Sequence, residues 1–312
     1  MTLRLTVDTE AWRRHVDSVA RQNPGLVPVV KGNGYGFGRA ELVVLAAGLA
    51  DTIAVGTVHE LADVPAGIVP VVLTPSHRPP DDVAPVLTVG SVEHVTALSG
   101  WPGRVLVKLA SSVRRFGVTV DELGPVTRAA RTAGLDVAGF SVHPPVAGTD
   151  DEHIDDIASW LDVLQPDDEV WVSHLSTDGY RNLRDAWPGR RFRIRLGTAL
   201  WHGDKRSLHL GADVLDVRPV RAGEHAGYRQ QRVPHDGQLV MVGAGTAHGV
   251  RPLPDGRSPF HFARQRLDLL EPPHMHTSMV LVPAGASGPR ADDIVDVQNP
   301  LISSHPDEVR WR

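Results

Sequence analysis

Short apolar segments alternate with longer amphipathic segments up to about residue 203. Val, Ile and Leu fill the short segments, as in buried strands, and the longer segments repeat apolar residues at helical spacing. Strands that alternate with helices predict a parallel sheet, and about eight such units predict a closed (β/α)8 barrel of the TIM type. The expected strands lie near residues 27–30, 53–56, 71–73, 86–89, 104–109, 137–142, 169–173 and 192–195.

After Gly203 the pattern changes to short strands separated by turns, with little helix. Such a run of strands after an alternating segment predicts a separate, mostly β domain. We therefore expect an α/β barrel over residues 1–204 and a smaller β domain over residues 205–312. The expected strands of the second domain lie at residues 214–220, 227–233, 238–242 and 279–282.

Composition is that of an ordinary soluble enzyme. The 312 residues are 41% hydrophobic and 22% charged, with a net charge of −5, which does not favour binding to nucleic acid or to an anionic membrane. The chain has no cysteine, which excludes disulfides, thiolate metal sites and cysteine nucleophiles. The start resembles no signal peptide and no apolar run is long enough to span a bilayer, so we expect a cytoplasmic protein.

Lys31 is the first candidate for chemistry. It follows the apolar run Val27-Pro28-Val29-Val30, and four glycines occur in the next seven residues. Catalytic side chains of barrel enzymes lie where strands end, and a desolvated lysine can act as a neutral nucleophile. The alternative is a surface lysine that precedes an ordinary glycine-rich turn.

The segment from Lys31 to Tyr35-Gly36-Phe37-Gly38 resembles the cofactor-binding lysine segment of the alanine racemase family. The family usually has alanine at positions 32 and 34 and histidine at position 37. The resemblance implies that pyridoxal 5'-phosphate is the cofactor, that Lys31 binds it covalently and that Tyr35 contacts it. It also implies a barrel followed by a β domain.

A second segment, from Lys108 to Arg115, is similar to a family strand in which a lysine precedes Arg-x-Gly by seven residues. The resemblance implies that Arg115 binds the phenolic oxygen of the cofactor and the substrate carboxylate, with Lys108 supporting it. A planar guanidinium offers several donors in a fork and suits both contacts. The family has Asp-Thr-Gly where this chain has Ala110-Ser111-Ser112.

Two further positions come from the resemblance alone. His143, after an expected strand, would pack against the cofactor ring, although a histidine at a strand end is often structural. The stretch that supplies a phosphate ligand in the family is one residue shorter here. Ser176 or Thr177 can fill that role, and Ser176 is the expected ligand.

The segment Arg195-Leu196-Gly197-Thr198 is similar to the family's Arg-x-Gly-Ile. It implies that Arg195 faces the pyridine nitrogen and that the N–H groups of Gly197 and Thr198 bind phosphate. An arginine does not readily give up its proton, so the ring nitrogen would stay unprotonated. That weaker electron sink suits plain proton exchange at Cα and disfavours transamination. It also argues against the related barrel decarboxylases, which have an acidic partner there.

Racemisation requires a base on each face of Cα. The segment from Gly223 to Tyr228 resembles the family stretch that ends in the second base. Tyr228 would therefore act opposite Lys31, from the partner subunit of a head-to-tail homodimer. A phenol needs a cationic neighbour to act as a base near neutral pH, and Arg229 or His225 could provide it.

Other positions in the second domain concern the substrate. The N–H of Met279, in a segment similar to the family's Ser-Met-Asp, would bind the substrate carboxylate. Thr246 and His248 stand where racemases have tyrosine and aspartate, and no tyrosine follows Tyr228 to match the family's late phosphate-binding tyrosine. We therefore expect a wider and less acidic entrance.

Together these features predict a pyridoxal-phosphate-dependent racemase for a small amino acid, with alanine as the expected substrate. One alternative is a pyridoxal-phosphate-binding relative without turnover. Another is an epimerase or lyase for a bulkier amino acid, which Thr246 would permit. A metal-dependent hydrolase is disfavoured, because His274 and His276 lack a third ligand at a recognisable spacing, and no metal site is expected.

Overall fold

The computed structural model of the chain describes residues 2–312. It divides into two compact units. The barrel unit contains residues 14–34 and 39–203, and the C-terminal unit contains residues 2–13, 35–38 and 204–312. None of the helices formed by residues 2–312 is long and apolar enough to cross a membrane.

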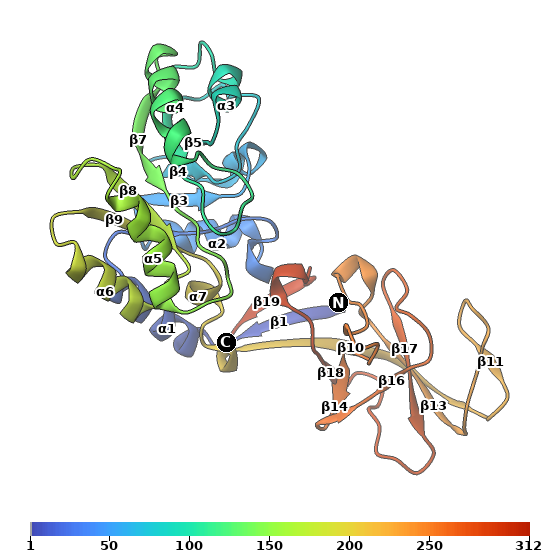
Figure 1. Cartoon of the computed structure of the whole chain (residues 1–312). Helices are drawn as coiled ribbons and strands as arrows, with labels where there is room; N and C mark the ends of the chain where they lie inside the picture. The colour runs from blue at the N-terminus through green and yellow to red at the C-terminus, as the bar shows by residue number, and fades with distance from the viewer. Residues whose placement is uncertain (1) are drawn as a thin grey trace. The chain divides into compact units, whose positions relative to one another are not determined.

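The barrel unit is built on an eight-stranded parallel sheet with the order β2-β9-β8-β7-β6-β5-β4-β3 (Figure 1). A parallel bridge between Val29 and Ala54 joins the two ends of that order. The Val30 N–H also donates to the Ala54 carbonyl at 2.8 Å, so the sheet closes and confirms the expected (β/α)8 barrel. The strands are β2 (Leu26–Pro28), β3 (Thr52–Val55), β4 (Val69–Val72), β5 (Val86–Val89), β6 (Arg104–Lys108), β7 (Asp136–Ser141), β8 (Glu169–Ser173) and β9 (Arg191–Leu196).

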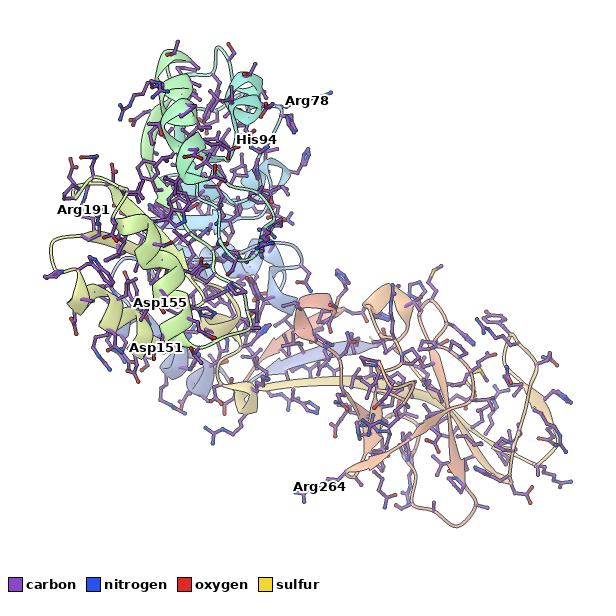
Figure 2. All side chains as sticks on the ribbon, in the orientation of Figure 1. Arg78, His94, Asp151, Asp155, Arg191 and Arg264 are labelled. Atoms are coloured by element: carbon purple, nitrogen blue, oxygen red, sulfur yellow. The ribbon has the colours of Figure 1, made fainter. Side chains whose placement is uncertain are left out.

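Helices connect the strands, and each buries one face. In α5 (Asp150–Leu161) the side chains of His153, Ile157 and Trp160 are buried, whereas Asp151 and Asp155 are exposed on the outside (Figure 2). That spacing is the helical period the sequence pattern indicates. The other helices are α1 (Thr9–Gln22), α2 (Arg39–Ala47), α3 (Val92–Ala97), α4 (Val120–Thr132), α6 (Thr177–Ala186) and α7 (Thr198–Trp201), with 3-10 turns η1 (Gly34–Gly36) and η2 (Val58–Asp63).

The carboxyl ends of the barrel strands carry buried polar side chains. All residues of β3 and β5 are buried. The last residues of β6, β7 and β8 are also buried, and they are polar: Lys108, Ser141 and Ser173. Arg195 is buried near the end of β9. Lys108 pairs in register with Ser141, and Ser173 with Arg195. Polar groups are expensive to bury, so their concentration at one edge marks that edge as a functional site.

The C-terminal unit is a mostly antiparallel sheet with the order β15-β14-β18-β10-β13-β17-β16, in which β1 also pairs with β10, and β19 pairs with β1. The long strand β10 pairs first with β1 and β18 and then, from Val214 on, with β13, with a register shift between Val214 and Asp216. Its strands are β1 (Leu3–Val7), β10 (Leu208–Val220), β11 (His225–Ala226), β12 (Gln231–Arg232), β13 (Gly237–Val242), β14 (Phe260–Phe262), β15 (Gln265–Arg266), β16 (Asp268–Leu269), β17 (Ser278–Pro283), β18 (Ile294–Val297) and β19 (Glu308–Trp311), with 3-10 turns η3 (Lys205–Ser207), η4 (Thr246–His248) and η5 (Leu301–Ser303).

Strand β1, near the start of the chain, belongs to this second sheet. Strand β1 pairs antiparallel with β10 and parallel with β19. The rings of Trp12, Phe37 and Trp311 pack together with centroid separations of 5.1–5.8 Å, which groups residues 35–38 with the C-terminal unit. The structure thus differs from an uninterrupted first domain over residues 1–204, and the boundary at 204/205 stays a prediction.

Candidate functional site

Lys31 lies directly after the segment that closes the barrel. The Val29 N–H donates to the Leu196 carbonyl and the Val30 N–H to the Ala54 carbonyl, each at 2.8 Å. Both valines are buried, so the backbone is fixed up to the residue before Lys31. The side chain therefore starts from a rigid point at the carboxyl edge of the barrel, where such folds carry their chemistry.

Glu60 in η2 holds the loop that follows Lys31. Its carboxylate accepts the Gly32 N–H at 3.0 Å and the Gly56 N–H at 2.6 Å, and Arg39 donates to the Gly32 carbonyl at 3.0 Å. A Cβ on Gly56 would lie 3.3 Å from the Lys31 Cβ, so glycine keeps this corner open. No motif in the sequence marks Glu60; the available signal is a lone acid shortly after the strand that neighbours Lys31.

The surroundings lower the pKa of Lys31. Burial contributes most, followed by the positive charges of Arg115 and Arg195, while Glu60 acts in the opposite direction. Although the side chain is open to solvent in the single chain, the protein around it disfavours the ammonium form. A larger fraction of neutral amine is what nucleophilic attack by a lysine requires.

Arg195 is the buried cation of this edge, with 7% of its surface exposed. Its guanidinium donates through Nη2 to the Val142 carbonyl at 2.7 Å and through Nε to the Val172 carbonyl at 3.5 Å. Burial and then the charge of Arg115 lower its pKa to about 10, so it stays a cation at neutral pH. Two carbonyl contacts fix its plane at the strand ends.

Lys108 and His143 are held as neutral bases beside Arg195. Burial, then Arg195 and Arg115, lower the pKa of Lys108 to about 6, and its Nζ donates to the Ser141 carbonyl at 3.4 Å. Burial, followed by Arg195, His174, Lys108 and Arg115, lowers the pKa of His143 to about 2. The His143 ring packs at 4.4 Å from the His174 ring, and its Nδ1 lies 2.6 Å from the Ser173 hydroxyl oxygen.

Arg115 lies in the exposed loop after β6, with its guanidinium 4.6 Å from the centre of the Phe116 ring. The base of that loop is closed by hydrogen bonds from Ala110 N–H to the Val118 carbonyl at 2.9 Å and from Val118 N–H to the Lys108 carbonyl at 2.8 Å. Arg115 is close enough to influence the pKa of Lys31, Lys108 and Arg195. The loop therefore brings a fourth basic side chain to the same edge.

These four basic groups share one positive potential. After burial, the charges of Arg115 and Arg195 lower the pKa of Lys31 and of Lys108, and the charge of Arg115 lowers the pKa of Arg195. The carboxylates that act in the other direction are Glu60 toward Lys31 and Asp156 toward Lys108. Like charges held together cost free energy unless an anion joins them. The barrel edge is therefore suited to an anionic ligand with an electrophilic group within reach of an amine.

The expected phosphate ligands, Ser176, Gly197 and Thr198, have different hydrogen-bond surroundings. Ser176 caps α6, since its hydroxyl oxygen accepts the Gly179 N–H at 3.0 Å. Its own N–H donates to Asp150 at 2.9 Å, and its hydroxyl also donates to the Asp150 carboxylate. These contacts make Ser176 the cap of α6, and its expected contact with phosphate stays a prediction.

Gly197 and Thr198 open the short helix α7, and Thr198 is exposed. The first N–H groups of a helix have no partner within the helix. The amides of these two residues are therefore suited to an anion, as the sequence predicts.

Three expected residues lie in the C-terminal unit. Tyr35, in η1, is buried with φ of 56°, and burial raises its pKa to about 12. Met279 lies in β17 opposite Met241. Tyr228 lies between β11 and β12 and is 86% exposed. Its ring is 4.5 Å from the ring of His274. From the sequence, His274 was considered only as a metal ligand.

The positions expected to form an entrance are also in this unit. His248 is buried: its Nδ1 accepts the Gly245 N–H at 3.0 Å and its Nε2 lies 3.3 Å from the Asp307 carboxylate. His248 thus holds the chain turn at η4, whereas Thr246 is exposed. No group of three or more His, Asp or Glu side chains able to hold a metal ion occurs within residues 2–312.

Comparison with known proteins agrees with this architecture. No curated protein sequence matches the chain significantly. The solved alanine racemase from Bartonella henselae with covalently bound pyridoxal phosphate has a TM-score of 0.75 at 16% identity, covering 99% of each chain. The alanine racemase from E. faecalis has a TM-score of 0.70 at 21% identity, covering 99% of this chain and 98% of that one. The Bacillus anthracis alanine racemase with bound L-Ala-P has a TM-score of 0.74 at 19% identity, covering 99% and 87%.

At these identities the solved structures establish the fold. The family evidence comes from the sequence: the model of the alanine racemase N-terminal domain matches residues 7–204, well over half of the chain and all of the barrel unit with its four basic groups. The chain therefore belongs to the alanine racemase family.

Proposed function

We propose that this chain is a pyridoxal-phosphate-dependent amino-acid racemase that interconverts L- and D-alanine. The observation that carries the proposal is Lys31, an amine of lowered pKa at the carboxyl edge of the barrel with Arg115 and Arg195 close by. Membership of the alanine racemase family supports the cofactor and the enzyme class. The Bartonella henselae relative holds this cofactor covalently.

The residues of the barrel edge fit the cofactor. Its aldehyde requires an amine such as Lys31, and its phenolic oxygen and phosphate are anions that the shared positive potential favours. Arg115 would meet the phenolic oxygen. The phosphate would be bound by the amides of Gly197 and Thr198 and by Ser176, whose N–H and hydroxyl also bond to Asp150.

Pyridoxal phosphate, when bound, withdraws electrons from the Cα of an attached amino acid and so makes the Cα proton removable. The Lys31 amine would remove or return that proton on one face. Arg195 would keep the pyridine nitrogen unprotonated, since a guanidinium with a pKa of about 10 does not give up its proton at neutral pH. His143, held neutral, would pack beside the ring without adding charge.

The second face needs a second base, and we assign it to Tyr228 of another copy of the chain in a head-to-tail homodimer. Tyr228 is exposed on the surface of its own chain, as a residue that acts in a neighbouring subunit must be. The substrate carboxylate would be bound by Arg115 and by the N–H of Met279. This division of labour places one base on each face of Cα.

The cofactor attachment can be tested chemically. Lys31, Lys108 and Lys205 are the lysines of the chain. Protein incubated with pyridoxal phosphate, reduced with borohydride and digested should carry the pyridoxyl mass on the peptide with Lys31. Lys31→Ala should lose both the label and the visible absorbance of the bound cofactor, whereas Lys205→Ala should keep them. Wild-type protein without label, or label that persists in Lys31→Ala, overturns the proposal.

The reaction can be tested by exchange of the Cα proton in deuterated water. We expect L-alanine and D-alanine each to gain deuterium and to converge to the racemate. The exposed, small Thr246 favours a second candidate, an epimerase for a bulkier amino acid. Assays across amino acids separate the two, because exchange with larger side chains but not with alanine supports the second candidate.

A further inference from the structure

Tyr228 occupies a hairpin tip that is unusually well anchored for an exposed residue. The hairpin joins β11 and β12, and Tyr228 is 86% exposed. An exposed tyrosine on a short hairpin ordinarily samples several rotamers, and fixing such a side chain costs free energy on binding. The surroundings of Tyr228 reduce that freedom from two sides.

Glu271 anchors the backbone of the tip. Its carboxylate accepts the Tyr228 N–H at 2.8 Å and the Arg229 N–H at 2.9 Å. Only 4% of Glu271 is exposed, so this carboxylate, from a distant part of the sequence, is buried beneath the turn. Gly227 has φ of +80°, and a Cβ there would lie 2.1 Å from the carboxylate. The turn is therefore shaped around this one side chain.

His274 anchors the phenol ring. Its Nε2 donates to the Glu271 carboxylate, and its ring lies 4.5 Å from the Tyr228 ring at an interplanar angle of 50°. The backbone of His274 is itself tied, with its N–H donating to the Thr277 carbonyl and its carbonyl accepting the Thr246 N–H, both at 2.8 Å. One buried carboxylate thus connects the backbone and the ring partner of Tyr228.

The charge state of Glu271 is consistent with this role. Burial alone would raise the pKa of the carboxyl, but hydrogen bonds from the Arg229 N–H, His274 and the Tyr228 N–H outweigh it and lower the pKa. The ionised carboxylate has acceptors enough for three donors. Removal of its charge would weaken all three contacts together.

We propose that Glu271 and His274 are positioning residues that hold the Tyr228 phenol in one orientation before it enters the site of a second copy. The inference deepens the proposed function and rests on it for the role of the phenol. Neither residue touches the reacting atoms. Their contribution is preorganisation: a misplaced group can cost a large factor in rate even when binding survives.

The ordering of the ring can be measured without turnover. The chain has 3 tyrosines, and Tyr35 and Tyr180 are buried, so tyrosine carrying carbon-13 in its ring gives few signals and two internal controls of folding. In wild type we expect an ordered Tyr228 ring with a nuclear Overhauser contact to His274. Glu271→Gln and His274→Ala should release the Tyr228 ring and leave Tyr35 and Tyr180 unchanged. A mobile Tyr228 in wild type, or an ordered one in both variants, overturns the inference.

Kinetics separate this inference from the proposed function. If racemisation depends on Tyr228, Glu271→Gln and His274→Ala should lower its kcat between about tenfold and a hundredfold with little change in KM, and Asp255→Asn, which removes an exposed acid of the same unit, should change neither. If Tyr228→Phe retains full racemisation, the proposed second base is overturned, while the ring measurement still decides the positioning. If Tyr228→Phe loses racemisation but both variants keep full kcat, the positioning inference alone fails.

Discussion

The environment of Lys108 leads to a prediction about how the free energy of unfolding depends on pH. Burial and the charges of Arg195 and Arg115 lower its pKa from 10.5 to about 6. Between those values the unfolded chain binds a proton that the folded chain does not, so the free energy of unfolding rises with pH. We expect a rise approaching about 1 kcal/mol per pH unit between pH 7 and 9 in the cofactor-free protein. Lys108→Met should remove most of it.

Urea unfolding at several pH values measures that slope. Lys205→Met is the matched control, because Lys205 is exposed and its loss should leave the slope intact. The pKa of Lys31 is also lowered, so a smaller rise of the same sign should survive in Lys108→Met. A slope identical in Lys108→Met and wild type would show that Lys108 is charged in the folded protein at neutral pH.

At this scale, local pattern identified some site residues and could not identify others. Lys31 was expected from the apolar run before it, because the carboxyl ends of parallel strands meet at one edge, whereas Lys108 and Arg195 were expected from the resemblance to the alanine racemase family. The sequence did not predict Glu60 or Glu271 as site residues, because each accepts hydrogen bonds from backbone N–H groups of a loop whose path the sequence does not specify. Ser176 caps α6 and bonds to Asp150, the first residue of α5, a contact that local pattern does not specify.

At the scale of elements, the loop from Ala110 to Val118 shows how backbone conformation presents a side chain. Gly117 has φ of +138°, and a Cβ there would lie 2.6 Å from the Leu109 carbonyl oxygen. Gly117→Ala should therefore strain the loop that carries Arg115 and destabilise the protein by about 2 kcal/mol. Gly189→Ala, where φ is ordinary and a Cβ meets nothing within 4 Å, should change stability little. Equal urea midpoints for the two variants would contradict the strain.

The alternation of strands and helices predicted the barrel, because parallel strands buried on both faces are nearly continuous apolar runs. Strand β1 was assigned to the first domain by its position in the chain. The alternation of apolar and polar residues in β1 points to the other unit: Leu3, Leu5 and Val7 are buried, while Arg4 and Thr6 between them are partly exposed. Such alternation is typical of an antiparallel sheet with one wetter face, which is where β1 pairs.

For the whole molecule, the sequence predicted two units but could not show which distant segments pair. Strand β1 lies beside β19 at the opposite end of the chain, and both strands belong to the C-terminal unit. The assembly is a further step, since the proposed second base is exposed on its own chain. A site that needs two copies makes activity a property of pairs of chains.

Complementation between inactive variants tests that property. Lys31→Ala lacks the cofactor amine and Tyr228→Phe lacks the second base, so each alone should be inactive in the interconversion of L- and D-alanine. A mixed dimer has one site that combines Lys31 of one copy with Tyr228 of the other, and one site that lacks both. After refolding an equal mixture, random pairing should restore about one quarter of wild-type activity. A mixture of Lys31→Ala with the double variant should restore none, because no intact site can form. If the first mixture stays inactive although its subunits exchange, Tyr228 acts within its own chain or not at all, because only a shared site turns two defects into one working centre.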